Sequence, residues 1–276
     1  MRSDSVCGRM PLWKWIVLFV CGLLLFFFIY GLSQGFGMMP ENRWVKFAVQ
    51  MALGVVILLL YGGYIRFFER RRVYQLDFRH FAFGFGNGLA IGLIYFCLVT
   101  GFLALCGCYR INGVCFRFDH LLSAFGSMFL VAVGEEVVFR GIMFRMIDER
   151  WNMWVALAVS GLLFGFLHIF NPGAGVFSSV CIAIEAGLLL GMAYKYTESL
   201  WLPIGIHLSW NFTQGAVFGF AVSGGDIGYA LFQPSIEGHR LLTGAAFGPE
   251  ASLPGAVLGL ALSVLLYLLF RKKSKA

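Results

Sequence analysis

Long apolar stretches recur along the whole of this chain, and they restrict its fold more than any other feature. A helix needs about 20 apolar residues to cross a hydrocarbon core about 30 Å thick. The candidate runs cover residues 12–32, 45–65, 81–105, 121–143, 154–170, 174–194, 202–220 and 254–270. In lipid, only helices and closed barrels satisfy all of their backbone hydrogen bonds. The sequence therefore predicts an all-α, polytopic membrane bundle of about eight transmembrane helices.

The composition agrees with a chain whose main partner is the lipid bilayer. Hydrophobic residues make up 59% of the 276 and charged residues 13%, against about 25% charged in soluble proteins. The net charge is +7, but the basic residues fall in short loops and at the C-terminus instead of forming a compact basic domain. We therefore expect no nucleic acid partner.

The placement of these basic residues predicts the orientation of the chain. Basic residues gather between the second and third runs and after the last run, and fewer lie in the alternate loops. Loops rich in Lys and Arg stay in the cytoplasm. We expect both termini in the cytoplasm and the sparsely charged loops outside. The outer loops also hold Cys106, Cys108 and Cys115, which could form a disulfide in an oxidising compartment.

Two adjacent acids interrupt the fourth apolar run. Glu135 and Glu136 lie in the middle of it, and Arg140 follows four residues after Glu136. On a helix, residues four apart share a face, so Glu136 and Arg140 are expected to form a structural ion pair. Glu135 points about 100° away from that pair. Because carboxylates are costly inside a bilayer, the unpaired Glu135 indicates a functional site; the alternative is that both acids only brace neighbouring helices.

Other polar side chains occur at membrane depth on three further runs. His168 follows Phe164 by four residues, His207 precedes Asn211 by four, and Glu185 stands alone in the sixth run. In lipid such groups need polar partners, so we expect Glu135, His168, His207 and Asn211 to converge on one cavity. A single membrane histidine is more often a packing residue, and for Glu185 a structural role is the preferred interpretation.

This set of groups is compatible with several functions. A carboxylate and an imidazole can activate water, and a second imidazole with an amide can stabilise an oxyanion, which suits peptide hydrolysis. Glu135, His168 and His207 could instead bind zinc, although no H-E-x-x-H helix is present. A proton-coupled transporter would use the same groups as a relay, but the expected internal repeat is missing. A non-enzymatic scaffold remains open as well.

The motifs resemble those of a known family. Glu135-Glu136-x-x-x-Arg140, Phe164-x-x-x-His168 and His207-x-x-x-Asn211 are similar, in order and spacing, to the motifs of CPBP (Abi) intramembrane proteases. That family includes the type II CAAX prenyl endopeptidases and bacterial proteins linked to bacteriocin immunity. The resemblance covers about residues 121–212 and implies a membrane-embedded endopeptidase, or alternatively an immunity protein. The family is often labelled as metalloprotease, so a zinc cofactor is neither required nor excluded.

The resemblance also implies residue roles and a division of the chain. Glu135 and His168 would activate water, and His207 with Asn211 would support the oxyanion. The expected division is a cytoplasmic tail (1–11), three helices with their loops (12–119), a CPBP-type catalytic core of four helices (120–220), and a loop, last helix and basic tail (221–276). The expected substrate is a membrane-associated or lipidated, CAAX-like peptide, and the expected location is the bacterial plasma membrane.

Overall fold

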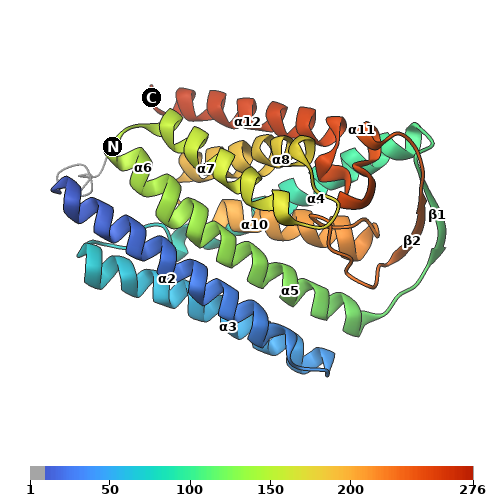
Figure 1. The fold of residues 1–276 in the computed structure, drawn as a ribbon, viewed down its shortest axis with the longest axis horizontal. Coiled ribbons are helices and arrows are strands. Elements are labelled where there is room, and N and C mark those ends of the chain that lie inside the picture. The colour runs from blue at the N-terminus through green and yellow to red at the C-terminus, as the bar shows by residue number, and fades with distance from the viewer. Residues whose placement is uncertain (1–9, 276) are drawn as a thin grey trace.

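The computed structural model describes residues 10–275 as a helical bundle with both described ends of the chain on the same side (Figure 1). The transmembrane-length elements are α2 (Leu12–Met38), α3 (Arg43–Tyr64), α4 (Phe81–Leu105), α5 (Phe118–Glu136), α7 (Met153–Leu167) and α12 (Leu253–Lys273). The shorter helices are α6 (Arg145–Arg150), α8 (Val176–Ile182), α9 (Leu189–Thr197), α10 (Trp201–Asn211) and α11 (Arg240–Thr243). Adjacent long helices run in opposite directions, so the loops alternate between the two ends of the bundle.

Several helices are joined end to end through wider turns. A π-helical segment, Val137–Phe144, links α5 to α6, and another, Ala183–Leu188, links α8 to α9. Each makes one continuous rod, of 33 residues in Phe118–Arg150 and 22 residues in Val176–Thr197. π-helical turns are rare and are often found at functional sites. Here the first of them begins directly after the two adjacent glutamates.

Seven rods in the described chain are long and apolar enough to cross a membrane, which makes this an integral, multi-pass membrane protein. The eighth expected span is α10, whose 11 residues continue through the 6 residues of the π-helical segment Phe212–Val217. It is shorter than the others because it does not meet lipid. Every residue of α10 is buried, whereas most of α2 and α12 is exposed.

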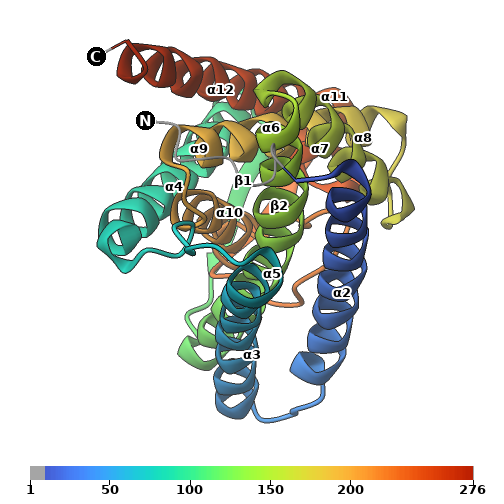
Figure 2. The same cartoon turned by 90° about the vertical axis from the view of Figure 1, so that its left-hand side faces the viewer.

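Helix α10 lies in the middle of the bundle, as the view along the long axis shows (Figure 2). It packs against α4, α5 and α9. The approach to α4 is close because glycines meet there: Gly88 and Gly92 of α4 face the backbone of α10, and Gly205 of α10 faces the backbone of α4. Small residues allow such close packing between helices in membranes, where the hydrophobic effect supplies little attraction.

Buried ion pairs tie the helices together at the end that carries the termini. Arg145 pairs with Glu69 at 2.5 Å, and Arg71 pairs with the same carboxylate at 2.8 Å and with Glu149 at 2.8 Å. Lys195 pairs with Asp148 at 2.5 Å. These contacts join the ends of α3, α6 and α9, so this end of the bundle is closed by paired charge.

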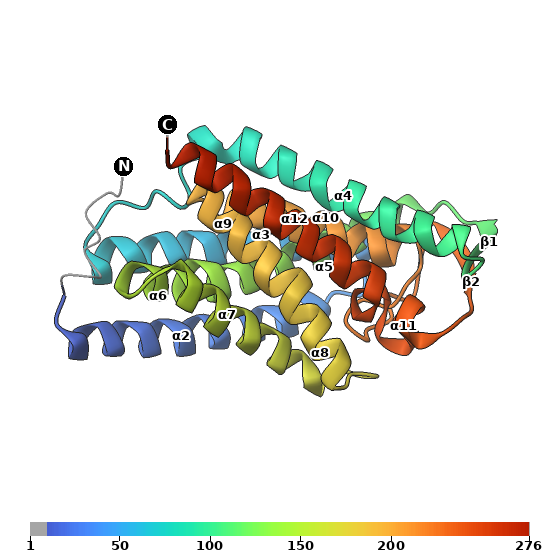
Figure 3. The same ribbon diagram turned by 90° about the horizontal axis from the view of Figure 1, so that it is seen from above.

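The opposite end is built differently, from a small sheet and a folded loop. Strand β1 (Tyr109–Val114) pairs antiparallel with β2 (Phe232–Ile236), and α11 follows (Figure 3). The all-α prediction therefore holds for the bundle, while this two-stranded ribbon was not foreseen. Tyr109 to Asn112 do alternate between apolar and polar residues, but this pattern is short and Gly113 interrupts it, so it was not recognised as a strand.

Two further predictions concern the three clustered cysteines and the N-terminal tail. Cys106, Cys108 and Cys115 surround β1, and all three are free thiols, so no disulfide joins them. The expected N-terminal tail, 1–11, ends where α2 begins at Leu12, but residues 1–9 of it lie outside the described residues. The division of the chain into four segments stays a prediction.

Candidate active site

Glu135 occupies the last turn of α5, at the edge of a cavity of about 760 Å³. Its side chain is 17% exposed, which makes it more accessible than its fully buried neighbour Glu136. The hydroxyl of Tyr30, from α2, donates a hydrogen bond of 3.2 Å to Oε1 of Glu135. The other carboxylate oxygen, Oε2, lies 3.9 Å from Nε2 of His207. Glu135 is therefore held between two helices with its carboxylate at the cavity wall.

All four candidate catalytic residues line this cavity. Glu135 comes from α5, His168 from the turn after α7, and His207 and Asn211 from α10. The buried α10 makes the meeting geometrically simple, because a short central helix presents His207 and Asn211 to both neighbours. Asn211 is 7% exposed and His207 is 6% exposed. Three separate parts of the chain thus contribute polar groups to one space within the bundle.

The contacts of His168 fix which ring nitrogen carries a proton. Nδ1 of His168 lies 2.7 Å from the carbonyl oxygen of Phe164. A carbonyl oxygen can only accept a hydrogen bond, so Nδ1 must be the protonated nitrogen. In the neutral ring this leaves Nε2 without a proton and able to take one from water. The Phe164 ring lies against the same imidazole, with ring centres 4.6 Å apart, and limits its rotation.

His207 is oriented by Glu136, a contact that the sequence did not indicate. Nδ1 of His207 lies 2.9 Å from Oε1 of Glu136, and the same oxygen accepts a hydrogen bond of 2.9 Å from Arg140. Glu136 therefore serves as acceptor to both partners. Because Nδ1 donates to Glu136, Nε2 is the nitrogen directed at Glu135. The predicted Glu136–Arg140 pair is present, and it extends into a chain that ends at the cavity.

Two further contacts, besides that with Glu136, hold the guanidinium of Arg140 in place. It donates a hydrogen bond of 2.5 Å to the carbonyl oxygen of Ala186, and its guanidinium lies 4.9 Å from the centre of the Phe164 ring. Only 1% of the residue is exposed. Cation–π contacts with desolvated guanidinium groups stabilise by about 2 kcal/mol. Arg140 therefore fixes Glu136 and, through it, the ring of His207.

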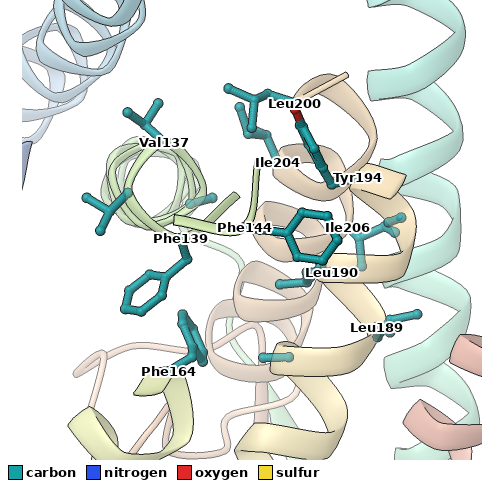
Figure 4. Close-up of a cluster of buried hydrophobic side chains, with 14 of the residues drawn as sticks. Val137, Phe139, Phe144, Phe164, Leu189, Leu190, Tyr194, Leu200, Ile204 and Ile206 are labelled. Carbon is teal, nitrogen blue, oxygen red and sulfur yellow. The ribbon is translucent and has the colours of Figure 1, made fainter. Parts of the chain in front are cut away.

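Aromatic packing separates the polar groups from the terminus-bearing half of the bundle. Phe139 and Phe164 face each other edge to face at 4.8 Å (Figure 4). Further along, Phe144 and Tyr194 pack at 5.6 Å beside Leu200 and Ile204. All of these side chains are buried. They form an apolar floor beneath the cavity.

A smaller cavity of about 210 Å³ adjoins the first between α2 and α7. The two share Tyr30, Glu135, His168 and Asn171, and the smaller one is otherwise lined by apolar groups such as Phe27 and Leu167. Phe27 and Leu167 are 37% and 41% exposed on the lipid-facing surface of the bundle. The polar cluster is therefore bordered by a side opening towards lipid.

Residues that the sequence analysis did not single out complete the wall. Glu250, on the single turn before α12, lines the cavity, and its carboxylate accepts a hydrogen bond from the backbone N–H of Ser223. The carbonyl oxygen of Ser223 accepts one of 3.0 Å from the Asn171 side chain. Tyr30 and Glu250 lie far from the motifs in sequence, so only the fold brings them there. An acid inside a Gly-rich loop was the one signal available for Glu250.

Glu185 is buried away from the cavity. Its carboxylate lies against Gly255 of α12, and its backbone lies against Gly259. Both carboxylate oxygens of Glu185 are buried, and the polar groups near them are the Tyr95 hydroxyl and the Glu250 carboxyl. Glu185 is 0% exposed and does not line the large cavity, so its placement favours a packing role between α12 and the π-helical turn.

The donor groups do not fit a zinc site. In the described part of the chain no three His, Cys, Asp or Glu side chains lie close enough together to share a metal ion. A zinc site needs three or four ligands at about 2.0–2.3 Å. Nδ1 of His207 is engaged by Glu136 and Nδ1 of His168 by a carbonyl oxygen, so only the two Nε2 atoms could bind a metal. In the described residues these atoms do not gather with Glu135 closely enough to do so.

Part of the chain matches a known protein family. Residues 117–213, from the start of α5 to the end of α10, match the family described as Type II CAAX prenyl endopeptidase Rce1-like. This segment contains Glu135, His168, His207 and Asn211, and it leaves out α2, α3, α4 and α12.

One curated protein is also similar to part of this chain. The "Putative membrane peptidase YdiL" of Bacillus subtilis (strain 168) is 29% identical over 77 residues, which is 28% of this chain and 29% of that protein. The match therefore spans less than a third of the length of either protein. No solved structure matches this protein.

Proposed function

We propose that this protein is a membrane-embedded endopeptidase that hydrolyses peptide bonds in membrane-associated or lipidated substrates with an activated water. The observation that carries the proposal is the meeting of Glu135, His168, His207 and Asn211 on one cavity inside a membrane bundle. The similarity of residues 117–213 to CAAX prenyl endopeptidases supports the same reaction class.

In the proposed mechanism, a water at the wall of the cavity loses a proton to Glu135. A carboxylate in this position is a suitable general base, and Nε2 of His168 is free to accept a proton as well. The resulting hydroxide attacks the carbonyl carbon of the scissile bond. Either group can afterwards return the proton to the leaving amine.

His207 and Asn211 are suited to the oxyanion that forms during this attack. A protonated His207 would present Nε2–H to the cavity, because its Nδ1–H is already held by Glu136. The amide of Asn211 is a second donor on the same face of α10. Preorganised donors of this kind stabilise an oxyanion by about 2.7–4 kcal/mol each.

The side opening between α2 and α7 supports a membrane-associated substrate. An apolar segment or a lipid anchor can stay in contact with lipid while the adjacent peptide bond reaches Glu135. Whether the substrate carries a prenyl group, another lipid or only an apolar segment is decided by the assay below.

The test is hydrolysis of lipidated and apolar peptides by the purified protein in lipid nanodiscs. Glu135→Gln should keep its fold and lose activity by about 10²–10⁴-fold, because only the general base is removed. Glu198→Gln, an exposed acid at the opposite end of the bundle, is the matched control and should be fully active. Chelator treatment should leave the rate unchanged. A wild-type protein without activity on any peptide, or equal activity in Glu135→Gln, would favour a scaffold or immunity role instead.

A further inference from the structure

The two ends of the bundle differ strongly in basic charge. At the end with the termini lie Lys14, Arg66, Arg70, Arg71, Arg72, Arg79, Arg145, Arg150, Lys195, Arg271, Lys272, Lys273 and Lys275. At the opposite end lie Arg43, Lys46, Arg110, Arg117 and Arg240. Arg71 and Arg145 form buried ion pairs, but the difference in the number of basic residues between the two ends remains large when these two are left out. Short loops rich in Lys and Arg stay in the cytoplasm.

The large cavity reaches the surface at the sparsely charged end. Its rim is formed by the turn between α2 and α3, with Glu41 and Lys46, and by His120 at the start of α5. The loop at 222–229 completes the rim. Every one of these segments lies at the end of the bundle that carries β1 and β2, away from the termini (Figures 1 and 3).

The cavity is closed towards the end with the termini. On the side of Glu136 that faces the termini, Arg140 of the π-helical segment Val137–Phe144 donates a hydrogen bond to the carbonyl oxygen of Ala186. The aromatic pair of Phe144 and Tyr194 lies nearer still to the termini. One residue after Arg140, the carbonyl oxygen of Gly141 accepts a hydrogen bond of 3.0 Å from Tyr61. All of these side chains are at most 4% exposed. Among residues 10–275, a water-filled path to Glu135 therefore comes from the end with β1 and β2.

From these two asymmetries we infer that the catalytic cavity is reached from the extracytoplasmic side, and that its substrates are segments of polypeptides exposed on the outer face of the membrane. The part of this inference that concerns substrates rests on the proposed function. The side of the membrane on which the cavity opens is inferred from charge and geometry alone. A cytoplasmic peptide would meet the closed, strongly basic end. An exported protein or an outer-leaflet lipoprotein would meet the open rim.

Sidedness can be measured without any activity. In a background lacking the other cysteines, native Cys115 marks the rim end, and Ser274→Cys marks the end with the termini; both positions are exposed. Ser127→Cys marks the cavity wall between the rim and Glu135. Whole cells are treated with a small, charged, membrane-impermeant thiol reagent, before and after permeabilisation.

Cys115 and Ser127→Cys should react in intact cells to at least 10 times the extent of Ser274→Cys, which should react only after permeabilisation. The inference is overturned if Ser274→Cys reacts in intact cells, or if Ser127→Cys reacts only after permeabilisation. Should Ser127→Cys be unreactive in both states, Ser123→Cys, one turn nearer the rim, replaces it under the same criteria.

A second measurement joins sidedness to substrate class. The active peptide from the assay above is added to right-side-out and to inside-out membrane vesicles. Cleavage should be at least 10-fold faster with the right-side-out vesicles, and the reverse result would overturn the inference. If labelling shows an outward cavity but neither vesicle type cleaves, the proposed function has failed while the sidedness stands.

Discussion

Nδ1 of His207 lies 2.9 Å from Oε1 of Glu136, the glutamate that also binds Arg140, while Nε2 of the same ring faces Glu135 at 3.9 Å. The two adjacent glutamates therefore approach one imidazole from its two nitrogens. Glu136 fixes the ring, and Glu135 shares the cavity with it. Glu136 is therefore more than the partner of Arg140 in an ion pair, because it also orients a histidine of the candidate site.

Replacing Glu136 should damage both stability and turnover. Glu136→Ala leaves Arg140 buried without its carboxylate, and unpairing a buried charge costs about 3–5 kcal/mol in soluble proteins. It also releases Nδ1 of His207, so the rate per folded molecule should fall. The measurements are the melting temperature in detergent and the rate in nanodiscs.

Glu69→Ala is the matched control for that variant. Glu69 pairs with the buried Arg145 at the end with the termini, outside the cavity. We expect a similar loss of melting temperature but a near-normal rate per folded molecule. Equal catalytic damage in both variants would mean that Glu136 acts on activity only through stability.

Tyr30→Phe should lower turnover with little change in stability. The Tyr30 hydroxyl donates to Oε1 of Glu135, and a hydrogen bond to a charged group contributes about 1.5–3 kcal/mol. Without it the carboxylate is less well positioned, so we expect a drop of about 10-fold in kcat. Tyr64→Phe, which removes a hydroxyl bonded to the backbone of Leu18, is the control and should keep its rate. An unchanged kcat in Tyr30→Phe would remove Tyr30 from the site.

Glu250 should make the stability of the protein depend on pH. Burial raises the pKa of Glu250 from 4.5 to about 7, while hydrogen bonds from Ser223 and the nearby His207 lower it in part. A carboxyl whose folded-state pKa is raised contributes stability that is complete below about pH 4.5. That contribution is lost as the pH rises through about 7. At 1.36 kcal/mol per unit, the change is about 3 kcal/mol at most.

The check is the melting temperature of wild type and Glu250→Gln at pH 5 and pH 8. The neutral variant should lack the decline that wild type shows between these values, with Glu237→Gln, an exposed acid, behaving as wild type. A parallel decline in wild type and Glu250→Gln would show that another group is responsible.

Helix α10 should be sensitive to single methyl groups on α4. A Cβ on Gly92 would lie 2.5 Å from the carbonyl oxygen of Ile206 and 2.9 Å from the nitrogen of Trp210, and neither backbone atom can rotate away. Overpacking of this kind costs about 1–3 kcal/mol. Gly92→Ala should therefore melt several degrees lower and lose activity, because Ile206 and Trp210 flank His207 and Asn211.

Gly101→Ala provides the comparison on the same helix. A Cβ at Gly101 meets open space, and alanine favours helix over glycine by about 0.8–1.0 kcal/mol. This variant should melt at the wild-type temperature or above it. A fall equal to that of Gly92→Ala would locate the effect in α4 itself and not in its contact with α10.

The sequence was sufficient to predict the helical bundle and the meeting of four polar side chains on one cavity, because both follow from the cost of burying polar groups in lipid. Spacing alone predicted that Glu136 and Arg140 would pair, and that His207 and Asn211 would share a face. It did not reveal the contact of His207 with Glu136, which depends on the rotation of α10 relative to α5. No local pattern encodes that rotation.

The spans predicted from the apolar runs place His207 at the wrong depth in the membrane. Full-length straight spans would place His207 near one membrane face and His168 near the other. The structure removes this conflict because α10 is short and wholly buried, and because the backbone changes to a tight turn at His168–Phe170. Counting residues from the ends of apolar runs assumes that every span begins at the membrane surface, and α10 does not. Tyr30 and Glu250 were missed for the related reason that they reach the site from distant parts of the chain.

The central position of α10 also has a consequence for biosynthesis. During translation this helix emerges after α2 to α9, yet it must occupy the space between α4, α5 and α9. Lipid is a poor environment for the buried polar side chains of α10, which are His207, Ser209 and Asn211. These side chains are instead surrounded by the neighbouring helices. The earlier helices must stay apart until α10 arrives. A chain arrested before residue 201 therefore contains Glu135 and His168 but lacks His207 and Asn211, so the candidate site cannot be complete until α10 has been made.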